Sequence, residues 1–233
     1  IVGYSGFPYI RDHIYGGNDL GGSILGSANF SDEVSDDVKR KMYNPDLLEA
    51  VHAYTRYYQG RVENIFGGCY GDYDYYTGAY SGYTHPRLEN AFVNFKPISN
   101  ADSYVERIYG AGQGAQDDRE GDKIQDYSYV LIDSPQDMDN FQAMVVFGAG
   151  ENNGIGMLTK VDPEDNPSQV SLDKVSAVID LVSGQIGNVY GGSYSQGNTR
   201  RTMVSVPSGS IISLGNIFGG AYGEKQGVLR IRP

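Results

Sequence analysis

The stretch that decides the fold is Gly187-Asn188-Val189-Tyr190-Gly191-Gly192, which returns almost unchanged as Gly215-Asn216-Ile217-Phe218-Gly219-Gly220. Its last four residues form a tetrad: a β-branched residue, an aromatic residue, a glycine and a second small residue. The tetrad begins at six positions in the chain, which are Ile14, Ile65, Ile108, Val146, Val189 and Ile217. Repetition of this kind predicts a protein built from stacked structural units.

Each repeat contains short segments rich in β-branched and aromatic residues, which cannot bury their apolar faces alone. We therefore expect the repeats to stack as rungs of β-structure. The tetrad aromatics should form one stacked internal column, made of Tyr15, Phe66, Tyr109, Phe147, Tyr190 and Phe218. The glycine after each aromatic suggests a left-handed or tightly turned backbone, and the second small residue suggests a close approach between rungs. An Asn precedes three of the tetrads and suggests a hydrogen-bond ladder.

The predicted fold class is all-β, with residues 1–233 forming one solenoid domain, a right-handed parallel β-helix. The 32 glycines and 20 tyrosines fit frequent turns and half-buried strands. The irregular spacing of the tetrads excludes a propeller of uniform blades, whereas a solenoid accepts insertions at its corners. A further strand pattern begins at Gly227-Val228-Leu229-Arg230-Ile231, so we expect the chain to be cut within a repeat.

Residues 31–60 show a different pattern, which predicts a short helical hairpin inserted between rungs. Ser31 would cap the first helix. Pro45 would open the second, which would pass Tyr54 and Tyr58 on its apolar face and end at Gly60. Such a hairpin would cap or brace the stack, or would serve as an arm that binds a partner.

Charge and composition exclude several classes of function. The net charge of −11 argues against nucleic acid as a partner, because phosphate binding requires clustered basic residues. The single cysteine, Cys69, excludes an intrachain disulfide and a zinc site with several cysteines. No run approaches the roughly 20 apolar residues of a membrane-spanning helix. The chain starts at Ile1 rather than Met, as expected of a processed or excised piece.

The Tyr/Gly-rich segment at residues 68–85 is the first candidate binding site, and we expect it to be an exposed loop. Its tyrosines offer flat apolar faces and hydroxyls, which suit sugar rings or a protein interface. The candidate binding residues are Tyr70, Tyr73, Tyr75, Tyr76, Tyr80 and Tyr83. The alternative is a loop that packs on itself.

Two acidic segments are candidate metal sites, and calcium is the cation that their carboxylates could hold. The candidate ligands are Asp72, Asp74, Asp117, Asp118, Glu120 and Asp122. Neither segment shows the repetition of Gly-rich calcium-binding repeats, so solvated turns are the alternative. No other cofactor is expected.

No catalytic residue is predicted. His13, His52 and His85 are scattered over unlike contexts, and the chain has no nucleophile elbow, phosphate loop or zinc-spaced pair. Cys69 follows a Gly-Gly pair without a histidine at a useful spacing, which favours a small half-buried residue over a nucleophile.

With its Gly-Asn-[Val/Ile]-[Tyr/Phe]-Gly-Gly segments, the chain resembles the Gly-Gly-punctuated repeat surface proteins of gut-type bacteria and the right-handed β-helix adhesins. The resemblance implies export, an extracellular or cell-surface location and an elongated scaffold. It implies a non-enzymatic adhesive or scaffold module whose loops bind host or bacterial glycans or proteins, with further repeats of the same chain as further partners. The alternatives are a β-helix polysaccharide lyase or glycoside hydrolase, and a structural spacer within a larger surface protein. The ligand, the handedness of the solenoid, the strands per rung and the oligomeric state are left open.

Overall fold

The computed structural model describes residues 9–17, 23–24, 53–70, 87–88, 90–97, 103–113, 127–134, 142–152, 155, 176–195, 199 and 201–223. Within these ranges every regular element is a β-strand, and none of them forms a helix. The all-β prediction is confirmed to this extent. The described part of the chain accordingly holds no helix of the length and hydropathy needed to cross a bilayer.

Ten strands form one sheet in which every pairing is parallel. They are β1 (Tyr9–Tyr15), β3 (Ala53–Tyr57), β4 (Arg61–Phe66), β6 (Asn90–Phe95), β7 (Tyr104–Tyr109), β8 (Tyr127–Asp133), β9 (Ala143–Phe147), β10 (Ala177–Tyr190), β11 (Thr202–Ser205) and β12 (Ile211–Phe218). The short strands β2 (Ser23–Ile24) and β5 (Arg87–Leu88) pair separately, also in parallel.

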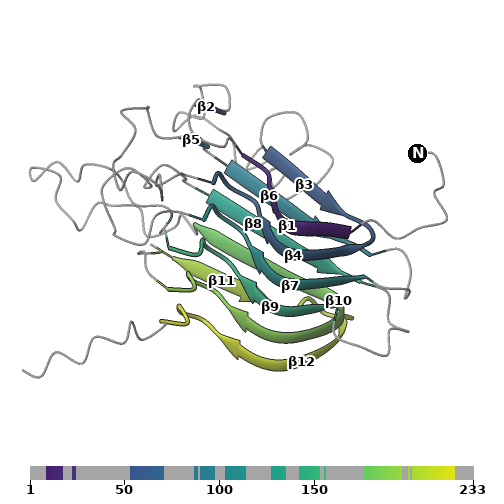
Figure 1. Ribbon diagram of the computed structural model, residues 1–233. Helices are drawn as coiled ribbons and strands as arrows, with labels where there is room; N and C mark the ends of the chain where they lie inside the picture. Colours follow the sequence, from purple (N-terminus) through teal and green to yellow (C-terminus); the bar gives the residue numbers. More distant parts are fainter. Residues whose placement is uncertain are drawn as a thin grey trace, which may run out of the picture.

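The sheet consists of two arms that meet at a bend (Figure 1). The first arm contains β3, β6, β8, the first half of β10, and β11. The second arm contains β1, β4, β7, β9, the second half of β10, and β12. We call a first-arm strand and the second-arm strand that follows it a rung. Among the described residues, the stack begins at β1, a second-arm strand without a described first-arm strand before it.

The tetrads lie directly above one another in the second arm. Ile65 pairs with Ile14 on one side and with Ile108 on the other, and the same register continues to Ile217 of β12. The irregular spacing of the tetrads along the sequence therefore disappears in the structure, because the extra residues lie between a tetrad and the first arm of the next rung.

An aliphatic core fills the space between the two arms. The second arm contributes Ile65, Ile108 and Val146, and the first arm contributes Val93 and Val130, all with side chains fully shielded from solvent. Successive residues of a strand point to opposite faces. The aromatic that follows each tetrad Ile or Val therefore lies on the other face of the second arm.

The tetrad glycines are required for a different reason than the sequence suggests. Three of the four left-handed glycines among the described residues, Gly60, Gly184 and Gly209, lie at the bends between the arms, and the fourth, Gly223, follows the last tetrad. At Gly110 and Gly148, φ is not left-handed, but a Cβ would stand closer than 3.0 Å to the carbonyl oxygen of the glycine in the next rung. The rungs therefore approach closely at the first glycine of the tetrad. They also do so at the second small residue, as expected, because a Cβ at Gly17 or Gly192 would stand 2.9 Å from a backbone nitrogen of the next rung.

Part of the predicted helical hairpin is wrong. Residues 31–52 lie outside the described residues, but Ala53–Tyr57 form strand β3 rather than the end of a helix. The prediction placed Tyr54 and Tyr58 on one face of a helix, but Tyr58 lies just after the strand. Tyr54 and Tyr57 both belong to β3. In the strand they lie on opposite faces, where Tyr54 stacks on Phe92 and Tyr57 stacks on Phe95.

Candidate functional site

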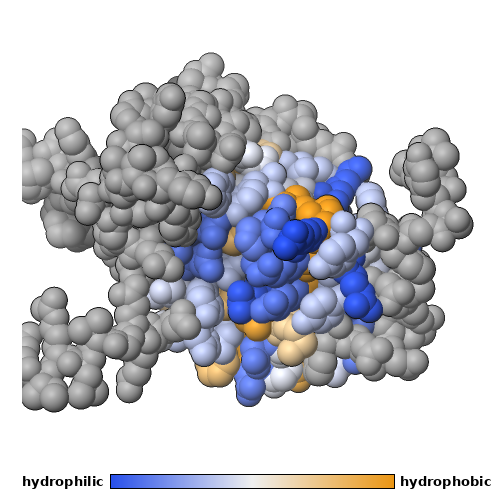
Figure 2. All heavy atoms as spheres, in the orientation of Figure 1, coloured by the Kyte–Doolittle hydropathy of each residue, from blue (hydrophilic) through white to orange (hydrophobic). Residues whose placement is uncertain are grey.

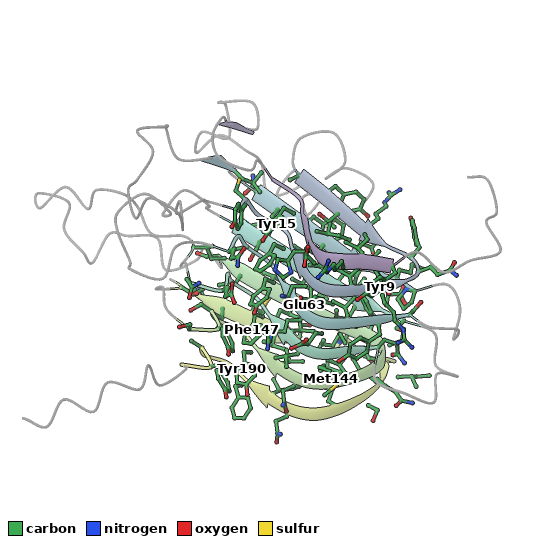
Figure 3. The ribbon with its side chains drawn as sticks, in the orientation of Figure 1. Tyr9, Tyr15, Glu63, Met144, Phe147 and Tyr190 are labelled. Atoms are coloured by element: carbon green, nitrogen blue, oxygen red, sulfur yellow. The ribbon has the colours of Figure 1, made fainter. Side chains whose placement is uncertain are left out.

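The six tetrad aromatics form one continuous stack along the second arm. Successive ring centroids are 4.5 to 5.2 Å apart, and the ring planes are within 13° of parallel. Figure 3 shows Tyr15, Phe147 and Tyr190 following one another down the stack. The stacked column expected from the repeat is present, but it lies on the face of the second arm that points away from the aliphatic core. Phe66 and Tyr109 are nevertheless fully buried.

Residues just after the tetrads cover the edges of the column. Tyr70 lies against Tyr15, Tyr194 meets Phe147 edge to face, and Tyr222 meets Tyr190 in the same way. Each of these tyrosines follows its own tetrad aromatic by four positions and contacts the aromatic one rung above. The repeat therefore extends past the tetrad, a signal that the sequence contained and that the tetrad alone did not reveal.

Gln113 and Glu151 occupy the same position in two rungs and make the edge of the column polar there. Beside them, the Arg107 guanidinium lies 2.8 Å from a carboxylate oxygen of Glu106 and 5.5 Å from the ring centre of Tyr194. Arg107 therefore contacts Glu106 of its own strand and also Tyr194, which is one of the tyrosines that follow the tetrads. Burial acts to lower the pKa of Arg107, but its neighbours Tyr109, Glu106, Tyr194 and Glu151 together outweigh burial and raise this pKa.

The hydroxyl of Tyr109 is buried at the centre of this polar region. Burial raises the pKa of Tyr109 above its ordinary range; Glu151 adds to the increase, whereas Arg107 opposes it. Although Arg107 lies close enough to affect this pKa, no group meets hydrogen-bond geometry with the hydroxyl oxygen. A buried polar atom without a partner is costly, so this hydroxyl is the least satisfied group of the column.

A hollow of about 440 Å³ opens where the column meets β1. It is lined by Asp12, His13, Tyr15, Tyr70 and Gln113. The Tyr15 hydroxyl donates a hydrogen bond to Oε1 of Gln113, and Nδ1 of His13 lies 3.2 Å from the side-chain nitrogen of Asn64. The hollow thus combines aromatic walls with a carboxylate, an imidazole and an amide. Such groups can bind a polar ligand by hydrogen bonds and ring contacts.

The ladder expected before the tetrads forms only in part. Asn216 donates to Asn188 at 3.0 Å, and His13 meets Asn64 at the other end of the stack. Arg107 and Val145 occupy the same register position between these pairs and interrupt the ladder.

A second, shorter aromatic column lies on the outer face of the first arm, and the sequence did not reveal it. The ring of Phe92 stacks between those of Tyr54 and Tyr129 at 4.6 and 4.8 Å. Polar neighbours hold the two tyrosines: Asn94 donates to the Tyr54 hydroxyl, and the Tyr129 hydroxyl donates to Asp180 at 2.7 Å.

Of the predicted binding tyrosines, Tyr70 is placed by the structure and lines the hollow. Tyr73, Tyr75, Tyr76, Tyr80 and Tyr83 lie outside the described residues, as do all six candidate calcium ligands. Among the residues that the structure describes, no three His, Cys, Asp or Glu side chains are grouped so that they could hold a metal ion. The side chain of Cys69 is half-buried and packs against a small cluster of Ala53, Leu88 and Ala91.

Comparisons with known proteins do not assign this chain to a family. No protein-family model, no curated protein and no solved structure matches the sequence or the fold.

Proposed function

We propose that this chain is a non-enzymatic scaffold module of parallel β-helix type, located at a bacterial cell surface, which holds binding segments on one side of a stiff stack of rungs. The binding segments are the connections between rungs, and their ligand is a glycan or a protein surface.

The observation that carries this proposal is the distribution of the connections. The first arm is joined to the second arm by short bends at residues 58–60 and 206–210, and β10 runs through both arms without a break. The longer connections, such as residues 71–86, 114–126 and 156–175, all run from the end of a tetrad to the first arm of the next rung. Because every pairing is parallel, these connections all leave the stack at the same edge.

The amino-acid sequence also differs between the rungs and the connections. The rungs repeat one signature, whose aromatics and glycines are used in contacts between rungs. The connections do not repeat, and they hold the Tyr/Gly-rich and the acidic segments. A rigid framework with variable connections is the usual arrangement of binding proteins.

The hollow at β1 supports a polar ligand. It lies at the base of the Tyr/Gly-rich connection, since Tyr70 both lines the hollow and precedes residue 71. Aromatic walls beside the carboxylate of Asp12 and the amide of Gln113 suit the apolar faces and hydroxyl groups of a sugar.

The test is a glycan array and a pull-down from cell-surface extracts with the full chain. Simultaneous replacement of Tyr73, Tyr75 and Tyr76 by Ser should abolish binding without changing the far-ultraviolet circular dichroism spectrum. Tyr9→Ser is the matched control, because Tyr9 is 72% exposed but belongs to a rung. Unchanged binding by the triple variant would remove the connection from consideration.

A further inference from the structure

The last rung of the stack shows an unused contact surface. Ile217 and Phe218 of β12 are 44% and 45% exposed, whereas their counterparts Ile65 and Phe66 are fully buried by the neighbouring rungs. Figure 2 shows a mostly hydrophilic face with hydrophobic residues at its lower edge, where β12 lies in Figure 1. One face of the Phe218 ring stacks on Tyr190, and no aromatic ring among the described residues stacks on its other face.

The contacts at the first glycine of each tetrad indicate which kind of surface would fit against β12. At the first glycine of the five preceding tetrads, the space for a Cβ is taken by the carbonyl oxygen of the glycine in the next rung. These are Gly16, Gly67, Gly110, Gly148 and Gly191. At Gly219 no described residue lies within 4 Å of that position. The surface therefore has the shape of an interface between rungs from which the second rung is missing.

The opposite end of the same chain carries the matching edge. β1 pairs with β4 on one side, and no described strand pairs with its other side. It contains the same signature, Ile14-Tyr15-Gly16-Gly17, in register with every tetrad below it. Two side chains of β1, Tyr9 and Ile10, are 72% and 40% exposed.

The backbone polarity of the two edges is also complementary. Along the stack, the N–H of each first glycine donates to the carbonyl oxygen of the aromatic in the next rung, as in Gly191 to Phe218 at 2.8 Å. By the same geometry, the N–H of Gly219 faces the open side of β12, and the carbonyl oxygen of Tyr15 faces the open side of β1.

We propose that the β12 edge binds the β1 edge of a second copy of this chain, in parallel and head to tail. Ile217 then pairs with the second copy's Ile14, and Phe218 stacks on its Tyr15, so that the aromatic column continues from one molecule into the next. Because the two edges are different surfaces, the contact does not close on itself and produces linear assemblies. This inference rests on the ends of the stack and not on the connections, although it shares Tyr15 with the hollow that supports the proposed function.

Two alanine substitutions at neighbouring glycines provide the test. In Gly219→Ala the new methyl group meets no described residue of the single molecule, but it collides with a carbonyl oxygen of a docked rung. In Gly220→Ala the new methyl group occupies a position where Ala111 and Ala149 already stand in the middle of the stack. At the equivalent Gly17 and Gly192 a Cβ would stand 2.9 Å from a backbone nitrogen of the next rung, so the second substitution should weaken docking slightly rather than prevent it. We therefore expect only the first substitution to prevent docking, although both variants keep their fold.

Sedimentation velocity of the full chain over a wide concentration range measures the result. The native chain and Gly220→Ala should form species larger than dimers as concentration rises. Gly219→Ala should associate at least about tenfold more weakly, with an unchanged circular dichroism spectrum. A native chain that stays monomeric or stops at dimers would overturn the proposal. Equal association of the two variants would do the same, because assembly would then use another surface.

Discussion

Removal of one buried hydroxyl should stabilise this protein. Tyr109 stacks between Phe66 and Phe147, so a phenylalanine in its place keeps both ring contacts. The lost oxygen atom is buried and has no hydrogen-bond partner. An unsatisfied buried polar group costs about 1 to 3 kcal/mol. The positive charge of Arg107, which lies near the Tyr109 hydroxyl, offsets part of this cost. We therefore expect Tyr109→Phe to increase the free energy of unfolding by about 1 kcal/mol, or Tm by about 2 to 4 °C for a chain of this length.

The same substitution at another level of the column should have the opposite sign. The Tyr15 hydroxyl donates a hydrogen bond to Gln113, so Tyr15→Phe should lower the free energy of unfolding by about 0.5 to 1.5 kcal/mol. Urea unfolding followed by circular dichroism measures both variants, with the m-value as the check that unfolding remains comparable. If Tyr109→Phe were as destabilising as Tyr15→Phe, the Tyr109 hydroxyl would have a partner and the account of the polar region would be refuted.

Four further outcomes follow from the contacts and burial of the described residues. Gly148→Ala should destabilise the fold by about 1 to 3 kcal/mol in urea unfolding, because its methyl group overlaps the Gly191 carbonyl and forces two rungs apart. The stability of the monomeric Gly219→Ala variant should stay close to that of the native chain. Phe147→Ala should cost about 3 to 5 kcal/mol in the same assay, since its ring is 1% exposed, and Phe218→Ala far less, since its ring is 45% exposed. Similar losses for the two Phe variants would contradict a column that is buried in its middle and open at its end. Burial raises the pKa of Tyr57 to about 12, above the ordinary tyrosine value near 10. The folded state thus disfavours ionisation, and roughly 2 kcal/mol of stability that is fully present below pH 10 should be lost as pH rises to 12. In Tyr57→Phe, pH titration of urea stability should show a smaller loss over this interval, although the variant is less stable at neutral pH because it lacks the hydroxyl bond to the Gly60 carbonyl.

The architecture of the second arm could be predicted from the sequence because its contacts are local to the repeat. A tetrad that recurs six times must place its aromatics at equivalent positions, and parallel pairing then stacks them. The face on which they stack could not be predicted, since Ile65 and Phe66 are both apolar and either could have faced the core. The structure assigns the β-branched residue to the core and the aromatic to the outer face.

The errors have a common physical origin, which is that different contacts can require the same residue. Glycine serves a left-handed bend at Gly60 and a crowded rung interface at Gly148, and a sequence pattern does not distinguish the two. The tyrosines of β3 are spaced like a helix face because both faces of that strand are covered by aromatic rings. In the candidate site, His13 and Gln113 are brought together by the stacking of distant rungs, which no local motif records.

The uniform register of the tetrads makes the length of this protein adjustable in whole units. Each rung meets the rung above and the rung below through the same side chains and the same glycine contact. Joining Phe147 directly to Gly191 would remove the β10 rung and one connection, and the β8–β9 rung would then meet the β11–β12 rung through equivalent residues. Unequal recombination between repeats can thus shorten or extend the stack by about 4.8 Å for each rung. A lineage could change the reach and the number of its binding segments without redesigning a core.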